Sequence, residues 1–156
     1  WIAGLNVTLR NAWNSLPDCA QSGLSLDQRP TLGQGKDMIT PVISVAIGGA
    51  FGAVARYLVG LAVAFPLGTL AVNVLGSFAI GLVWALFAAR GLQAWLPLVM
   101  TGFLGGFTTF SAFSLDTLRL VEGGRVAAAG GYVLASVMLS LLACALGLWL
   151  VKGMTT

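Results

Sequence analysis

Apolar residues are distributed unevenly along this chain, and the change comes near residue 40. Residues 1–40 are rich in Asn, Gln, Ser, Asp and Gly, contain prolines, and show no sustained period of apolar positions. Such a stretch buries too little apolar surface to fold by itself, so we expect a loosely ordered polar leader. Met38 stands just before the first long apolar run, so residues 1–37 also fit an upstream extension or a misassigned start.

Four long apolar runs fill the rest of the chain, residues 41–156. They cover residues 42–65, 69–89, 95–118 and 126–151. About 20 consecutive apolar residues cross the hydrocarbon core of a bilayer as a helix. The predicted fold class is therefore an all-α membrane protein with four transmembrane helices per subunit.

The centre of the third run, residues 102–114, is poor in helix-forming residues. The adjacent Gly105 and Gly106 are followed by the β-branched Thr108 and Thr109. We expect the third helix to be broken here, although a continuous helix that uses these residues for packing fits equally well. Unwound backbone at membrane depth lies in protein or lines a wet cavity, and its freed carbonyls suit a cation. In an antiparallel pair of subunits, two such breaks would meet near the midplane and cage a small hard ion such as sodium.

Glycines recur four residues apart where helices are expected to touch. Gly48 and Gly52 lie in the first run, and Gly102 and Gly106 in the third. Such spacing lets two backbones approach closely, because packing replaces the hydrophobic effect between helices in lipid. We therefore expect tight helix contacts at these positions.

Polar side chains inside the apolar runs are candidates for a pore or a helix interface. Asn73 places an amide near the start of the second run. Tyr132, Ser136 and Ser140 recur every four residues in the fourth run and form a hydroxyl stripe. Amide and hydroxyl donors can replace the water around a dehydrating anion. Hydrogen bonding between helices, worth about 1 kcal/mol each, explains the stripe slightly better on sequence alone.

Two phenylalanines in the third run share one helical face. Phe110 and Phe113 are three residues apart. The edges of aromatic rings carry partial positive charge, so a small anion can contact them. Phenylalanines at this spacing are more often ordinary core residues, and sequence alone favours that interpretation.

Composition restricts the classes of protein to which the chain can belong. Hydrophobic residues make up 58% and charged residues 8%, with a mean hydropathy of +0.93, which excludes a water-soluble fold. Eight Lys and Arg residues are spread along the chain without a basic stripe, so we expect no nucleic-acid partner. There is no His, and Cys19 and Cys144 are far apart, so we expect neither a zinc site nor an enzyme.

Basic residues are nearly balanced between the two predicted membrane faces. Arg90 and Lys152 fall on one side, and Arg119 and Arg125 on the other. The positive-inside rule then favours neither orientation. We expect insertion in both orientations and assembly as an antiparallel, dual-topology homodimer in the lipid bilayer. Arg56, inside the first run, is interpreted as structural or as a source of vestibule electrostatics.

Three ordered stretches, residues 48–57, 68–77 and 102–114, together resemble the Fluc (CrcB-type) fluoride channel family. The resemblance extends from about residue 43 to the C-terminus. It implies a dual-topology homodimer of a bacterial plasma (inner) membrane, with two antiparallel pores and a central structural sodium ion. It also implies passive exit of fluoride from the cytoplasm, which relieves fluoride toxicity.

The resemblance assigns roles to particular residues. The backbone carbonyls of Gly105 and Thr108 are similar to those that hold the sodium ion. Arg56 resembles the arginine of the first span. The residues that resemble the fluoride pore of the family are Asn73, Phe110, Phe113, Tyr132, Ser136 and Ser140.

Two alternative functions also fit a four-span membrane chain. A small dual-topology, proton-coupled efflux transporter needs a titrating carboxylate within the membrane. The only candidates are Asp116, near the end of the third run and three residues from Arg119, and Glu122 in the following loop. The second alternative is a non-conducting membrane assembly subunit, which could have the same composition as a channel. It would be distinguished from a channel because the purified protein would release no ions from liposomes.

Overall fold

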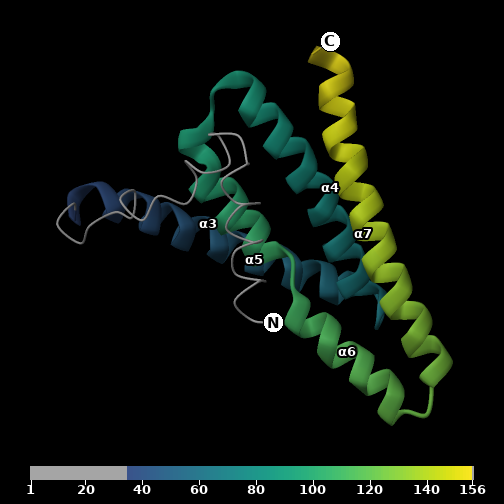
Figure 1. Ribbon diagram of the computed structural model, residues 1–156. Helices are drawn as coiled ribbons and strands as arrows, with labels where there is room; N and C mark the ends of the chain where they lie inside the picture. Colours follow the sequence, from purple (N-terminus) through teal and green to yellow (C-terminus); the bar gives the residue numbers. More distant parts are fainter. Residues whose placement is uncertain (1–34, 156) are drawn as a thin grey trace, which may run out of the picture. The chain divides into compact units, whose positions relative to one another are not determined.

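The computed structural model describes residues 35–155, and residues Met38–Thr156 form one compact unit. Helix α3 spans Gly35–Ala62, α4 spans Leu67–Arg90 and α7 spans Val126–Thr155. The third membrane crossing is composite, and all four crossings are long and apolar enough to span a bilayer (Figure 1). The all-α fold class with four membrane-spanning helices is therefore confirmed.

The helix bounds differ from the predicted runs at the start of the first span. Helix α3 begins at Gly35, inside the stretch that was predicted as a polar leader, and ends at Ala62 rather than residue 65. Pro41 lies within this helix. The rest of the predicted leader, residues 1–34, lies outside the described residues, so its order stays a prediction.

The third crossing is assembled from four consecutive pieces. A 3-10 turn, η3 (Gln93–Trp95), leads into the π-helix η4 (Pro97–Leu104) and the short helix α5 (Gly105–Phe107). Two extended residues follow before α6 (Phe110–Glu122) resumes the crossing. The break predicted in the middle of the third helix is therefore confirmed.

Glycines bring α3 against the third crossing. A Cβ at Gly48 would lie 2.8 Å from the Phe103 backbone nitrogen, and one at Gly52 would run into the Phe103 carbonyl oxygen. From the other side, a Cβ at Gly106 would lie 2.5 Å from the Gly49 carbonyl oxygen. Because backbone cannot move aside as a flexible side chain can, these positions require glycine. The tight helix contacts expected from the four-residue spacing are confirmed.

Helices α4 and α7 lie side by side along their length (Figure 1). Their approach is again made at glycines: a Cβ at Gly81 would run into the Cys144 carbonyl, and one at Gly147 into the Phe78 carbonyl. Helix α4 ends at Gly91, whose φ of 68° closes the last turn in the left-handed region. The broken third crossing packs against the α4–α7 pair.

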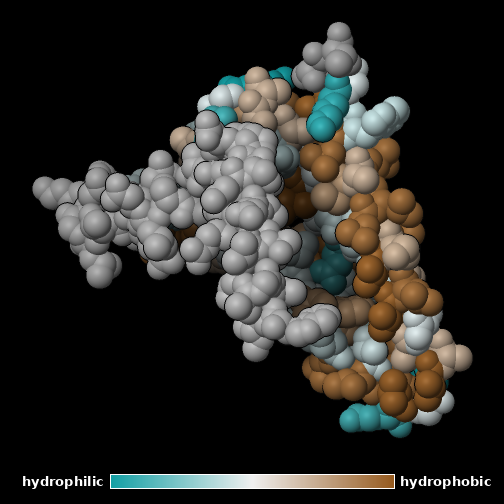
Figure 2. All heavy atoms as spheres, in the orientation of Figure 1, coloured by the Kyte–Doolittle hydropathy of each residue, from teal (hydrophilic) through white to brown (hydrophobic). Residues whose placement is uncertain are grey.

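The surface is largely apolar, as lipid contact requires. Figure 2 shows a hydrophobic band along α7 with hydrophilic atoms near its two ends. Large apolar side chains exposed on this helix are Val126, Leu134, Val137, Met138, Leu139, Leu141, Leu142, Leu146, Trp149 and Leu150. These exposed apolar side chains are suited to contact lipid tails or another protein surface.

Candidate anion site at the break in the third span

The backbone unwinds at two threonines in the middle of the third crossing. Thr108 has φ −77° and ψ 155°, and Thr109 has φ −154° and ψ 119°, both extended. Thr109 is the N-cap of α6, and its hydroxyl accepts a hydrogen bond from the Ala112 amide at 3.2 Å. The threonines predicted to weaken the helix therefore form the break and cap the helix that follows it.

Asn73 of α4 holds the unwound segment through both ends of its side-chain amide. Its Oδ1 accepts a hydrogen bond from the Thr109 amide at 2.8 Å, and its Nδ2 donates to the Thr109 carbonyl at 3.0 Å. The amide thereby supplies the partners that a continuous helix would have provided. A primary amide has a second N–H on Nδ2, which remains available to a ligand.

The carbonyls of Gly105 and Thr108 are the candidate cation ligands. Helix α5 ends at Phe107, so the carbonyls of its last turn lack the amides that a continuing helix would offer. Among residues 35–155, no hydrogen bond to either carbonyl oxygen is found. Gly105 is exposed and Thr108 half-buried. Hard oxygen donors of this kind suit a small cation such as sodium, and the residues present fit that group.

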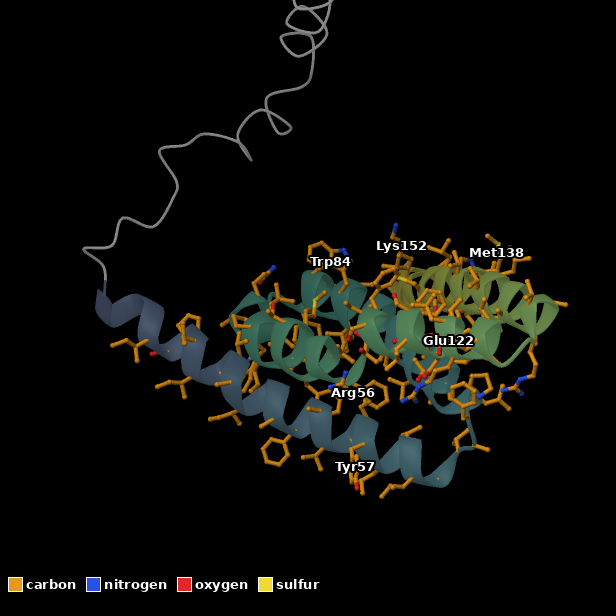
Figure 3. All side chains as sticks on the ribbon, turned by 90° about the horizontal axis from the view of Figure 1, so that it is seen from below. Arg56, Tyr57, Trp84, Glu122, Met138 and Lys152 are labelled. Carbon is orange, nitrogen blue, oxygen red and sulfur yellow. The ribbon has the colours of Figure 1, made fainter. Side chains whose placement is uncertain are left out.

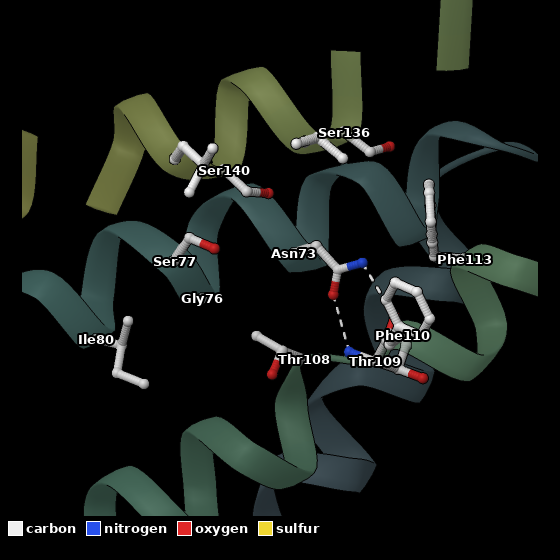
Figure 4. Close-up of a pocket in the computed structure, with 12 residues that line it drawn as sticks. Asn73, Gly76, Ser77, Ile80, Thr108, Thr109, Phe110, Phe113, Ser136 and Ser140 are labelled. Carbon is white, nitrogen blue, oxygen red and sulfur yellow. Dashed lines mark hydrogen bonds between the residues drawn. The ribbon is translucent and has the colours of Figure 1, made fainter. Parts of the chain in front are cut away.

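A cavity of ≈ 380 Å³ adjoins the break. Figure 4 shows it between the broken crossing, α4 and α7, with the lining residues Asn73 and Thr109 joined by their two hydrogen bonds. Predicted site residues that line it are Asn73, Thr108, Phe110, Phe113, Ser136 and Ser140. The lining also includes Gly76, Ser77, Ile80, Thr109, Val137 and Leu141. Residues that are up to 68 positions apart in sequence, from Asn73 to Leu141, thus meet at one site.

Three aromatic rings form a row beside the cavity. The rings of Phe110 and Phe113 have centroids 5.4 Å apart and planes tilted by 46°, and Phe113 lies 5.5 Å from the Tyr132 ring. Such tilted pairs turn ring edges, the positive part of the aromatic quadrupole, toward neighbouring groups. Phe110 is 77% exposed, although it begins a helix inside the membrane crossing. Phe110 is therefore open to the cavity and to anything that covers it.

The hydroxyl stripe of α7 points into the same region. Tyr132 and Ser136 are 6% and 5% exposed, and neither the Tyr132 Oη nor the Ser136 Oγ has a hydrogen-bond partner among the described residues. Leaving a buried hydroxyl without a partner costs about 1–3 kcal/mol, so the Ser136 hydroxyl, which lines the cavity, is a candidate donor to a ligand there. Tyr132 does not line the cavity itself but packs behind Phe113. The Tyr132 hydroxyl nevertheless faces Thr69 of α4, Asp116 of α6 and Ser136, so polar contact between helices, the alternative favoured from sequence, also fits Tyr132.

Asp116 is buried and takes a partner that sequence reasoning missed. It is 8% exposed, and its Oδ2 accepts a hydrogen bond from the Thr69 hydroxyl at 2.6 Å. Arg119, three residues away on the same helix, forms no ion pair with Asp116 in the part of the chain that the structure describes. Both Thr69 and Asp116 line a second, smaller cavity of ≈ 150 Å³ near the α3–α4 turn. Only the helix packing, not the spacing along the chain, brings these two residues together.

Arg56 lies apart from the main cavity. It is half-buried, does not line that cavity, and makes no ion pair within residues 35–155. Figure 3 shows Arg56 pointing from α3 toward the other helices, whereas Tyr57 points away from them. No group of three or more His, Cys, Asp or Glu residues that could hold a metal is found in the described part of the chain.

A family profile described as CrcB-like protein, Camphor Resistance (CrcB), matches residues 43–148. The chain belongs to the CrcB family. A CrcB-family relative from Paracoccus denitrificans, named fluoride-specific ion channel FluC, is 54% identical over 117 residues, covering 72% of this chain and 94% of its own. Proteins of the same name from Ruegeria sp. and Rhizobium etli are 47% and 51% identical, covering 76% and 70% of this chain and 100% and 94% of their own.

Membership in the CrcB family confirms the resemblance drawn from the three stretches of sequence. The named CrcB-family relatives are ion channels, which agrees with the expectation that this chain is not an enzyme. The matched residues 43–148 include the break and the whole lining of the cavity. The site described above is therefore built from family sequence and not from the N-terminal leader.

Proposed function

We propose that this chain is a fluoride-selective channel and that the cavity beside the break forms part of its pore. The observation that carries the proposal is that the buried Ser136 hydroxyl, which has no hydrogen-bond partner among the described residues, lines the cavity together with the tilted rings of Phe110 and Phe113. The names of the relatives support fluoride as the ion. In a bacterial inner membrane, such a channel would let fluoride leave the cytoplasm passively and reduce its toxicity.

Fluoride is small and strongly hydrated, so it needs closely spaced donors in exchange for its water. The cavity offers the second N–H of Asn73, the hydroxyls of Ser136 and Ser140, and ring edges. No Lys or Arg lines it. Neutral donors bind an anion without trapping it, which conduction requires.

We propose that the working unit is an antiparallel homodimer with two pores. Phe110 is too exposed in one subunit to confine an ion, and a second copy would cover it. The described basic side chains near the two ends are balanced, with Arg90 and Lys152 against Arg119 and Arg125, which supports insertion in both orientations. In such a pair, the carbonyls of Gly105 and Thr108 from both copies would hold a sodium ion. That ion would tie the two breaks together as a structural element.

The proton-coupled transporter is less well supported. Its mechanism needs a carboxylate that exchanges protons with water, whereas Asp116 is buried and already hydrogen-bonded to Thr69. The relatives are named as ion channels, which also argues against a non-conducting assembly subunit.

Fluoride release from liposomes tests the proposed function. The purified chain is reconstituted in liposomes loaded with potassium fluoride, valinomycin is added, and external fluoride is followed with an electrode. Rapid fluoride release, with none from matched potassium chloride liposomes, is expected. Folded protein that releases neither anion would contradict the channel, and equal release of both would contradict its selectivity.

The dimer and the sodium ion are tested by a separate measurement. Thermal unfolding in detergent is followed in sodium chloride and in N-methylglucamine chloride of equal ionic strength, together with the mass of the protein–detergent complex. Two copies per complex and a higher unfolding temperature in sodium are expected. A monomer that conducts fluoride, or identical unfolding in both salts, would contradict this part of the proposal.

A further inference from the structure

The unwound Thr108 rests against a helix that has no side chain at the point of contact. A Cβ added to Gly76 of α4 would collide with the Thr108 methyl group, Cγ2, and would lie 3.3 Å from the Phe107 ring and 3.7 Å from the Thr108 Cβ. Gly76 is buried and lines the main cavity. Figure 4 shows the Thr108 side chain between the break and α4, directed toward Gly76.

Thr108 cannot easily turn away from this contact. Its hydroxyl donates to the Leu104 carbonyl at 2.9 Å, and its amide donates to the same oxygen at 2.9 Å. A β-branched side chain has few allowed values of χ1, so fixing the hydroxyl also fixes the methyl group. The methyl position is therefore tied to the backbone at the end of α5.

Gly76 and Asn73, both on α4, contact the two consecutive residues of the break, Thr108 and Thr109. They are three residues apart on α4, so they share a face, and Asn73 holds the Thr109 backbone by two hydrogen bonds. The hydrogen bonds fix where Thr109 lies along α4. The contact at Gly76 fixes how closely Thr108 approaches α4, and so how wide the cavity is at that level.

We infer that Gly76 is a positioning residue for the pore: its bare backbone seats the Thr108 methyl group and thereby sets the distance of the broken segment from α4. This inference rests on the proposed function only where fluoride release is the readout. A side chain at residue 76 would push Thr108 outward, displace its carbonyl, and strain the adjoining Asn73–Thr109 hydrogen bonds.

The test is a rescue experiment on the full chain. Gly76→Ala is expected to slow fluoride release at least about tenfold, in line with the strain of overpacking a filled site. Hydrogen–deuterium exchange of the peptide that contains Thr109 is expected to speed up, and this readout does not depend on the transported ion. Adding Thr108→Ser removes the colliding methyl group, so the double variant is expected to return to the release and exchange of Thr108→Ser alone.

Gly81→Ala is the matched control on the same helix. Its Cβ would run into the Cys144 carbonyl of α7, which Thr108→Ser does not relieve. The inference is overturned if Gly76→Ala behaves like the unsubstituted chain. It is also overturned if adding Thr108→Ser does not restore the Gly76→Ala variant, which includes the case in which neither the single nor the double variant folds. Equal restoration of Gly81→Ala by Thr108→Ser would overturn it as well. An unsubstituted chain that releases no fluoride would contradict the proposed function, and the exchange experiment would still decide the inference.

Discussion

Replacing Asn73 by Leu is expected to loosen the break in the third span. Leucine has the same branching and number of side-chain heavy atoms as asparagine but cannot pair with backbone. Both hydrogen bonds to Thr109 would be lost, from its amide at 2.8 Å and to its carbonyl at 3.0 Å. Because Thr109 is 8% exposed, water would not readily replace the lost partners.

The size of the effect follows from the number of orphaned groups. Each buried backbone group left without a partner costs about 1–3 kcal/mol. With two groups affected and some relaxation of the unwound segment, we expect the free energy of unfolding to fall by about 2–4 kcal/mol. Ser77→Ala is the control, one turn further along α4 in the same cavity, and it removes a hydroxyl with no hydrogen bond among the described residues. This control should change the free energy of unfolding by less than about 0.5 kcal/mol.

Unfolding in mixed micelles by titration with dodecyl sulfate, followed by tryptophan fluorescence, measures this free energy. Hydrogen exchange at the Thr109 amide reports the same event locally and should speed up roughly tenfold or more in Asn73→Leu. An Asn73→Leu protein that unfolds within about 0.5 kcal/mol of Ser77→Ala would refute the role assigned to the side-chain amide.

Three further predictions concern the pore and the helix contacts. Phe110→Ile and Phe113→Ile, which keep most of the volume but lose the ring edge, should each slow fluoride release about tenfold with the dimer intact; unchanged release in both would remove the aromatic contribution. Ser136→Ala should leave the free energy of unfolding unchanged or higher, because it removes an unpartnered buried hydroxyl, while slowing release; a large loss of stability would show that this hydroxyl has a structural partner. Gly52→Ala should lower the free energy of unfolding by about 1–3 kcal/mol, whereas Gly60→Ala, where nothing lies within 4 Å, should not; equal effects would argue against the close contact of α3.

The sequence predicts the four crossings and the break because both depend on local chemistry. An apolar run of sufficient length predicts a membrane crossing, however the helices pack against one another. The glycines and threonines that disfavour helix at residues 105–109 act within their own segment, and the observed break falls on Thr108 and Thr109. The close approach at Gly48 and Gly52 is likewise visible in their spacing, although the partner backbone is not.

Features that depend on the register between helices are not visible in the sequence. The polar character of Asn73 marks it as a candidate, but its pairing with Thr109 depends on how α4 is aligned with the break. The hydrogen bond between Thr69 and Asp116 joins residues 47 positions apart. From the sequence alone, Arg119, three residues away, is the more obvious partner for Asp116. Tyr132 shares the spacing of Ser136 and Ser140, yet its ring packs against Phe113 and does not line the cavity.

The claim that the cavity beside the break carries fluoride is tested most directly by closing it chemically. Ser140→Cys, in a chain that also carries Cys19→Ser and Cys144→Ser, is reconstituted in liposomes and treated with an anionic thiosulfonate while mass spectrometry follows the modification. Fluoride release that declines in step with modification is the predicted result, because a bulky negative group would occupy the space lined by Ser136 and Phe113. Complete modification with undiminished fluoride release would contradict the assignment of this cavity to the pore.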